Sequence, residues 1–242
     1  MKTSIEYDGV HVPIKIRRER RSSIRYSITS KSVNLLMPRY LPVFDLEKEV
    51  DKIKNWCRGQ FDKDPELLNR FRVIVYRHGE FIRIFGKDFR ILIFEDARSN
   101  LTGRINKDHD VIIKVPKGVE EHMKHEAIGK LLSRIFSSFF HKDISNRVQY
   151  FNQMYFQEDI VGIRLKNNQT NWGSCSSKRN INLSSRLLFA PLEVLDYVIV
   201  HELAHLKEMN HSPRFWKIVS DVMPDYKEKE KWLSKHGETL KF

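Results

Sequence analysis

Nine consecutive residues, 198–206, constrain this chain more than any other segment. They read Val-Ile-Val-His-Glu-Leu-Ala-His-Leu and contain the HExxH pattern at His201, Glu202 and His205. Residues four positions apart lie one above the other on the same face of a helix. Two imidazoles at this spacing can therefore hold one metal ion, and Glu202 can reach a water molecule beside that ion.

The residues around this pattern predict a buried helix. Apolar side chains fill almost every other position, namely Leu195, Val198, Ile199, Val200, Leu203, Ala204 and Leu206. The alternative is a surface helix with two solvated histidines, but a helix that is apolar on nearly all sides is buried. Burying the three polar side chains without partners costs about 1–3 kcal/mol for each unsatisfied group. A metal ion removes that cost, so the segment favours a metal site.

A third metal ligand must come from elsewhere, because a catalytic zinc ion normally has three protein ligands and one open position. His211, which follows His205 by six residues, is the first candidate. Ser212 and Pro213 resemble an N-cap followed by a proline at the first helical position. The chain is therefore expected to turn sharply at 208–212 and to bring His211 back towards the metal. The other candidates for this position are His236, Glu193 and Asp221.

An ordered series of short motifs surrounds the HExxH pattern. It consists of Trp172-Gly-Ser-Cys175, Asn180-Ile-Asn-Leu183, Arg186-Leu187, Pro191, Asp196-Tyr197, His201-Glu-Leu-Ala-His-Leu206 and Asn210-His-Ser-x-x-Phe-Trp216. This series resembles the YgjP-like zinc metallopeptidase family, which is itself similar to the SprT/Spartan and WLM peptidases. The resemblance implies a zincin-like metal-binding part with zinc ligands at His201, His205 and His211 and a general base at Glu202. Asn171 departs from the family pattern, which usually has a basic residue there.

The charge balance of the chain points to an acidic partner. Its 43 Lys and Arg residues outnumber its 31 Asp and Glu residues, which gives a net charge of +12. Such an excess favours nucleic acid or another acidic surface, although it can also serve solubility alone. A predicted hairpin around 18–23 concentrates this charge, with Lys15, Arg17, Arg18, Arg20, Arg21 and Arg25. This hairpin is the candidate nucleic-acid surface, and a solvated hairpin without a partner is the alternative.

Cysteine usage and hydropathy indicate the compartment. The only cysteines are Cys57 and Cys175, and they form no CxxC pair or disulfide framework, which fits a reducing cytoplasm. The first residues contain no apolar signal-peptide segment. No apolar run approaches the roughly 18 residues of a membrane span, so a membrane is not an expected partner.

The pattern of the whole chain predicts an α+β fold. Alternating apolar residues predict strands at 12–16, 24–28, 33–37, 73–76, 81–85, 89–94 and 111–115. Helices are expected at 44–70 with a break at Asp64-Pro65, and at 119–151, 191–208 and 225–235. We therefore expect a basic, strand-rich part at 1–118 and a helical zinc metallopeptidase part at 119–242, with a single domain as the alternative. No internal repeat is visible. If the resemblance holds, 180–185 is the exposed strand that pairs with substrate backbone beside the metal.

The sequence thus predicts a zinc-dependent metallopeptidase. Zinc would polarise the peptide carbonyl and lower the pKa of its bound water to near 7. Glu202 would accept the water proton and pass it to the leaving amine, while Tyr197 or Arg186 would stabilise the oxyanion. Two alternatives stay open. One is a nucleic-acid- or partner-binding protein with minor peptidase activity or a structural zinc, for which Cys175 is the only nearby fourth ligand. The other is a zinc hydrolase of a non-peptide amide.

Overall fold

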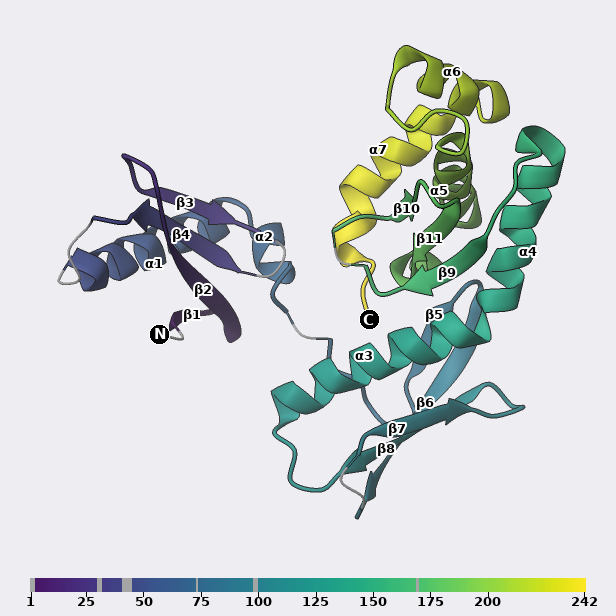
Figure 1. The fold of residues 1–242 in the computed structure, drawn as a ribbon. Helices are drawn as coiled ribbons and strands as arrows, with labels where there is room; N and C mark the ends of the chain where they lie inside the picture. Colours follow the sequence, from purple (N-terminus) through teal and green to yellow (C-terminus); the bar gives the residue numbers. More distant parts are fainter. Residues whose placement is uncertain (1–2, 30–31, 41–44, 73, 98–99, 169) are drawn as a thin grey trace. The chain divides into compact units, whose positions relative to one another are not determined.

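The structure is a computed structural model that describes residues 3–29, 32–40, 45–72, 74–97, 100–168 and 170–242 (Figure 1). The chain divides into two compact units, Met1–Val73 and Ile74–Phe242, and each has a hydrophobic core of its own. This division falls earlier than the boundary expected at 118/119. The reason is that the strands between 81 and 116 share one core with the helices that follow them.

The first unit consists of a four-stranded sheet followed by two helices. The strands are β1 (Thr3–Tyr7), β2 (Val10–Glu19), β3 (Arg25–Ile28) and β4 (Val33–Pro38), and the helices are α1 (Asp45–Lys63) and α2 (Glu66–Asn69). Buried and less buried positions alternate along β2 and β4, as the period-two pattern predicted. The predicted helix breaks at Asp64-Pro65, as expected for a residue that precedes proline.

The strand order of this sheet corrects the predicted basic hairpin. The order is β1-β2-β4-β3, with β4 parallel to β2 and antiparallel to β3. Since β2 and β3 are separated by β4, the segment 18–23, which includes the last two residues of β2, leads to a strand with which β2 does not pair. It is therefore a crossover connection, which we call the basic connection. Local turn residues signalled a bend there, but they do not determine which strands pair across it.

The second unit opens with the same arrangement. Its strands β5 (Phe81–Ile84), β6 (Lys87–Asp96), β7 (Thr102–Ile105) and β8 (Asp110–Pro116) are followed by α3 (Glu121–Phe139). The order β5-β6-β8-β7 and the strand directions repeat those of the first sheet. The first turn of each sheet, Asp8-Gly9 or Phe85-Gly86, has both residues at positive φ, as tight hairpin turns require. The structure therefore contains an internal ββββα repeat that the sequence had not revealed.

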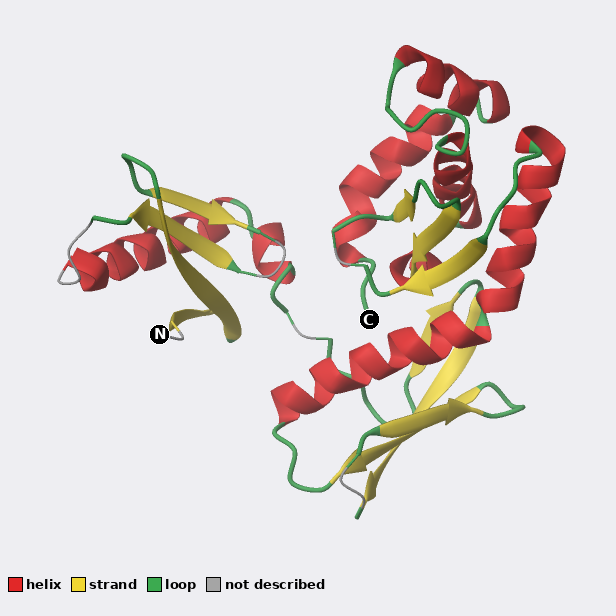
Figure 2. Ribbon diagram, viewed as in Figure 1, coloured by secondary structure: helices red, strands yellow, loops and turns green. Residues whose placement is uncertain are grey.

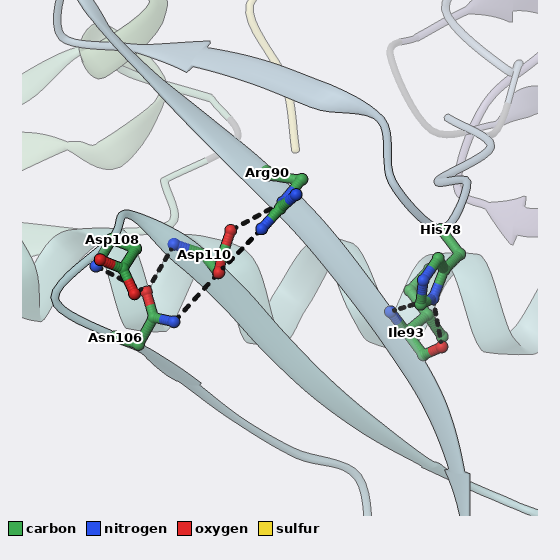
Figure 3. Close-up of polar contacts among 6 residues, drawn as sticks. All are labelled: His78, Arg90, Ile93, Asn106, Asp108 and Asp110. Carbon is green, nitrogen blue, oxygen red and sulfur yellow. Dashed lines mark hydrogen bonds and ion pairs between the residues drawn. The ribbon is translucent and has the colours of Figure 1, made fainter.

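Polar contacts fix the paired strands of the second sheet (Figure 3). Arg90 of β6 lies opposite Asp110 of β8 and donates to its carboxylate at 2.8 and 3.2 Å. The side-chain amide of Asn106 donates to the same carboxylate at 3.0 Å. These hydrogen bonds hold the pKa of Asp110 below its usual range, and the bond from Arg90 makes the largest contribution. Further along β6, the carbonyl oxygen of Ile93 lies 2.8 Å from Nδ1 of His78, a residue that precedes β5. The expected strand at 73–76 is not formed at 74–76, and Val73 lies outside the described residues.

A smaller sheet and further helices complete the second unit (Figure 2). They are α4 (His141–Phe151), β9 (Gly162–Lys166), β10 (Gly173–Cys175), β11 (Asn180–Ser184), α5 (Leu192–Ala204), α6 (Pro213–Val222) and α7 (Tyr226–His236). The helical stretch expected at 119–151 is thus two helices that meet at Phe140. The overall α+β class is confirmed. In the described part of the chain, no helix combines the length and apolar character needed to cross a membrane.

The order of the small sheet is β10-β11-β9, which corrects the expected edge strand. The segment 180–184 is β11, which pairs with β10 on one side and β9 on the other. A strand paired on both sides has no free backbone groups for a substrate. The two edge strands of this sheet are instead β10 and β9. The sequence could not show this, because the three residues of β10 are too few to display a period.

Candidate metal centre

Helix α5 places the HExxH residues at its buried C-terminal end. Ten of its thirteen residues are buried, as its apolar sequence predicted. The carboxylate of Asp196 forms an ion pair with Arg147 of α4, which fixes the rotation of α5 about its axis. The helix ends at Ala204, so His201 and Glu202 lie in its last turn and His205 follows it directly. This end is four residues earlier than the expected one.

The chain then turns and brings a third imidazole to the first two. Ser212 caps α6 by accepting a hydrogen bond from the backbone of Phe215 at 3.3 Å, and Pro213 follows at the first helical position, as predicted. His211 lies in this turn. One nitrogen from each of His201, His205 and His211 lies within 4.8 Å of the other two, which is a group able to hold a metal ion. The rival candidates do not join it, since His236 contacts the carbonyl of Trp232 and Asp221 pairs with Lys217.

Two aromatic residues of α6 hold the three imidazoles. The ring of Phe215 is fully buried and lies 4.5–4.9 Å from each of the three imidazole centroids. Trp216 stacks on His211 at 5.7 Å with an interplanar angle of 26°. These ring contacts hold the turn that carries His211 against α6.

The protonation of the cluster fits a metal ion. Burial, with the neighbouring histidines, lowers the pKa of His201 to about 3, and burial also lowers the pKa of His205. Nδ1 of His205 lies 3.1 Å from the carbonyl of Glu208, which can only accept, so Nδ1 carries the proton and Nε2 keeps a lone pair. Nε2 of His201 and Nε2 of His211 are 3.0 Å apart. A contact this short between two ring nitrogen atoms is favourable when a cation or a proton lies between them. The lowered pKa values keep the imidazoles neutral, which is the form that binds metal.

Glu202 is enclosed on the opposite side by β10. Its side chain is 5% exposed, and burial raises its pKa to about 8, against a lowering contribution from a hydrogen bond with the backbone of Cys175. Gly173 leaves the space for this side chain, because a Cβ atom at that position would lie 2.4 Å from Oε1 of Glu202. In the sequence, the motif Trp172-Gly-Ser-Cys175 carries no signal beyond the family resemblance. Its glycine is required by direct contact with the buried carboxyl group.

Replacing Gly173 with alanine should therefore displace Glu202. The added methyl group would also lie 2.6 Å from Cγ of Glu202, so the whole carboxyl end of the side chain must move. We expect hydrolytic turnover to fall by about 100-fold, the usual cost of a misplacement of about 1 Å, while bound metal is retained. The matched control is Gly162→Ala in β9, where the Cβ atom would meet only the side chain of Asn180 at 2.9 Å. Equal turnover of the two variants would show that the position of Glu202 does not limit the reaction.

The three imidazoles and Glu202 open into one pocket of about 610 Å³. Its walls are β10 with the two residues before it, α5, the turn that carries His211, and α7. The edge of β10 therefore lines the pocket that contains the metal-binding group. Nδ2 of Asn171 donates to the carbonyl of Gly173 at 2.8 Å. Asn171, the residue that departs from the family pattern, therefore engages one of the backbone acceptors on the edge of β10.

The two candidates for oxyanion stabilisation, Tyr197 and Arg186, differ in their position relative to the pocket. Tyr197 lines the pocket with its ring 6.0 Å from that of His201. Arg186 does not line it: its guanidinium group donates to the carbonyls of Leu240, at 2.6 Å, and Gly237. That group also lies over the ring of Trp172 at 4.1 Å. Arg186 thus joins the C-terminal segment to Trp172, and of the two candidates Tyr197 is the one that lines the pocket.

Cys175 does not belong to the group of three imidazoles. Its thiol is half-buried and lies 3.7 Å from the carbonyl of Ser176. Burial, together with the charge of Glu202, raises the pKa of this thiol to about 11. A neutral thiol is a poor metal ligand, so the geometry does not provide the fourth ligand that a closed structural site requires.

The chain belongs to the YgjP-like metallopeptidase family, since the sequence model of that metallopeptidase domain matches residues 21–236. It is similar to the UTP pyrophosphatase of Escherichia coli (strain K12), with 25% identity over 139 residues that make up 56% of this chain and 83% of that protein. Two crystal structures of metallopeptidase zymogens are also similar. Abylysin of Pyrococcus abyssi shares 26% identity, with a TM-score of 0.35, over 38% of this chain and 93% of its own. Jannalysin of Methanocaldococcus jannaschii shares 24% identity, with a TM-score of 0.35, over 38% of this chain and 94% of its own.

Proposed function

We propose that this protein is a zinc-dependent metallopeptidase with His201, His205 and His211 as zinc ligands and Glu202 as the general base. The observation that carries the proposal is the meeting of three imidazoles and one buried carboxyl group in a single pocket of about 610 Å³. Nitrogen ligands in a group of three suit a catalytic zinc ion, which keeps one position open. Membership of a metallopeptidase family supports the same reaction class.

The residues of the chain support a metal-assisted hydrolysis. A bound zinc ion would supply Lewis-acid chemistry, by polarising the substrate carbonyl and lowering the pKa of water. Glu202 would accept a proton from the attacking water and deliver it to the leaving amine. Its buried position strengthens such a proton transfer, because the low dielectric raises the basicity of the carboxylate. The phenol of Tyr197 would donate a hydrogen bond to the oxygen that gains negative charge.

The edge of β10 would position a peptide substrate. An extended peptide can add to a free strand edge through backbone hydrogen bonds, which gives affinity without strict sequence preference. The edge strand beside the pocket is β10, in place of the segment 180–185 expected from the sequence. Asn171 would have to release the carbonyl of Gly173 before a substrate could use it.

A second candidate reaction is the hydrolysis of a nucleoside triphosphate. The similarity to a protein named UTP pyrophosphatase favours it. The same pocket could serve this reaction, since a metal ion beside a general base can also promote attack of water on a phosphoryl group. Hydrolysis of a non-peptide amide is a third use of the same groups.

Parallel assays with an unfolded protein and with UTP test these reactions against each other. We expect the purified protein to cleave the unfolded protein, to lose this activity with a chelator, and to recover it with zinc. Cleavage products are measured by mass spectrometry, and released pyrophosphate or phosphate by an enzyme-coupled assay. Zinc-dependent release from UTP without any peptide cleavage would replace the peptidase assignment by the second candidate.

The partner and compartment are part of the same proposal. The basic connection, residues 18–23 with the neighbouring Arg17 and Arg25, would bind nucleic acid through phosphate contacts. Its excess of arginine supports this role. A cytoplasmic location is supported by two cysteines that are both free in the structure.

A further inference from the structure

A second concave surface of the Ile74–Phe242 unit lies between α3 and β9. It is a cavity of about 460 Å³. Its lining includes five basic residues, namely Lys130, Arg134, His141, Arg164 and Lys166. Among the described residues that line it, none is acidic and none belongs to the pocket of the metal centre. The two cavities are therefore distinct, and this one carries charge of a single sign.

The sequence places these charges on one surface by simple periodicity. Lys130, Arg134 and Ser138 are four residues apart and lie on the same face of α3. In β9, Arg164 and Lys166 are exposed, whereas the intervening Leu165 is half-buried. Residues two apart in a strand point to the same side. The helix and the strand thus each direct a row of cations into the same cavity.

Most of these cations have no neutralising partner. Lys130 pairs with Glu126 at 2.6 Å, outside the cavity. For Arg134, Arg164 and Lys166, no ion pair is found within the described ranges. Like charges gathered in one concavity repel each other, and an anion bound between them relieves that repulsion.

Hydrogen bonds hold the two walls of the cavity in place. Nε2 of His141, at the start of α4, lies 3.0 Å from the carbonyl of Ile163 in β9. On α3, the hydroxyl of Ser133 pairs with that of Ser185 at 2.8 Å, and both are buried. The cavity is therefore formed before a ligand arrives. Serine hydroxyls on α3 add donors suited to phosphate oxygens.

The length of the row of basic and hydroxyl side chains along α3 indicates the ligand. Along α3, the lining residues Lys130 and Ser138 are eight positions apart, which is about 12 Å at 1.5 Å per residue. A single phosphate cannot reach both ends, whereas one nucleic acid strand rises about 3.4 Å per nucleotide and presents several phosphates over that length. The described lining contains no Phe, Tyr or Trp on which a base could stack. We propose that this cavity binds successive phosphates of a nucleic acid strand, independently of base sequence.

The test is a fluorescence-anisotropy titration of the full chain with a labelled DNA duplex of mixed sequence at several salt concentrations. Arg164→Ser with Lys166→Ser should weaken binding about tenfold at low salt. It should also flatten the log–log salt slope by about 1.8, since each lost phosphate contact removes about 0.9. Both side chains are exposed on an edge strand, so the fold should persist, as circular dichroism can verify.

The matched control is Arg104→Ser with Lys107→Ser. It removes the same two residue types from exposed positions in β7 and the turn after it, outside the cavity. A charge-preserving exchange, Arg164→Lys with Lys166→Arg, should keep the parent affinity. The titrations are repeated with Arg17, Arg18, Arg20 and Arg21 replaced by serine, so that the basic connection cannot mask the effect.

Three results would overturn the proposal. The first is equal affinity and salt slope in the cavity variant and the control. The second is no binding of the duplex by the parent protein at low salt. The third is displacement of the duplex by inorganic triphosphate at the same phosphate concentration, which would assign the cavity to a small polyphosphate.

Discussion

Replacing Glu202 with glutamine should lower turnover by several orders of magnitude while zinc stays bound. Glutamine has nearly the same shape but cannot accept the proton, and general-base catalysis is typically worth about 10²- to 10⁴-fold in rate. We therefore expect kcat to fall within that range, because the group acts in the chemical step. The three imidazoles are untouched, so metal content should equal that of the parent protein. The measurements are steady-state kinetics on an unfolded protein substrate and zinc content by mass spectrometry.

Glu193→Gln is the matched control for this variant. Glu193 lies in the first turn of the same helix, is exposed, and does not line the pocket. Its replacement removes one carboxylate from α5 without changing the site, so turnover should stay close to that of the parent. Equal hydrolysis by Glu202→Gln and the parent would exclude Glu202 as the base, whatever the substrate.

Removing any one of the three imidazoles should release the metal. His201→Ala, His205→Ala and His211→Ala each leave two ligands, which is too few for a stable protein-bound zinc ion. Even loss of a group that only orients a ligand costs about 10- to 100-fold in metal affinity, so loss of a ligand should exceed that. Zinc content after dialysis and the zinc-dependent rise in Tm are the measurements, because a ligand that binds only the folded state stabilises it.

His236→Ala is the control for the third ligand. The imidazole of His236 contacts the carbonyl of Trp232 and lies outside the group of three. It was also a rival for the third position, so this variant discriminates between the two assignments. If His211→Ala kept the parent zinc affinity and His236→Ala lost it, the third ligand would be misassigned.

The candidate site was predictable where it depends on short segments. The pair His201 and His205 follows from helical spacing, and the turn before α6 follows from the cap formed by Ser212 and Pro213. These are local rules that hold in any fold. The position of His211 beside the pair needed only that turn. The choice between Tyr197 and Arg186 was not predictable, because the guanidinium group of Arg186 donates hydrogen bonds to backbone carbonyls that lie more than fifty residues later in the chain.

The contact between Gly173 and Glu202 shows why the rest could not be predicted. Its two residues are far apart in sequence, and nothing in the local pattern around Gly173 requires a glycine. The need arises only when β10 packs against α5 and leaves no room for a Cβ atom. The same holds for the cavity between α3 and β9, whose two rows of cations are ordinary solvated faces until they meet.

The sequence by itself determined the α+β class, the break at Asp64-Pro65, the buried helix with its HExxH pattern and the turn that follows it. Each depends on hydrophobic period, proline or capping chemistry within a few residues. Only the tertiary structure decided the pairing of β2 with β4, the free edge of β10 and the repeated ββββα arrangement. The physical reason is that an alternating strand shows which side chains are buried but not which neighbour accepts its backbone hydrogen bonds.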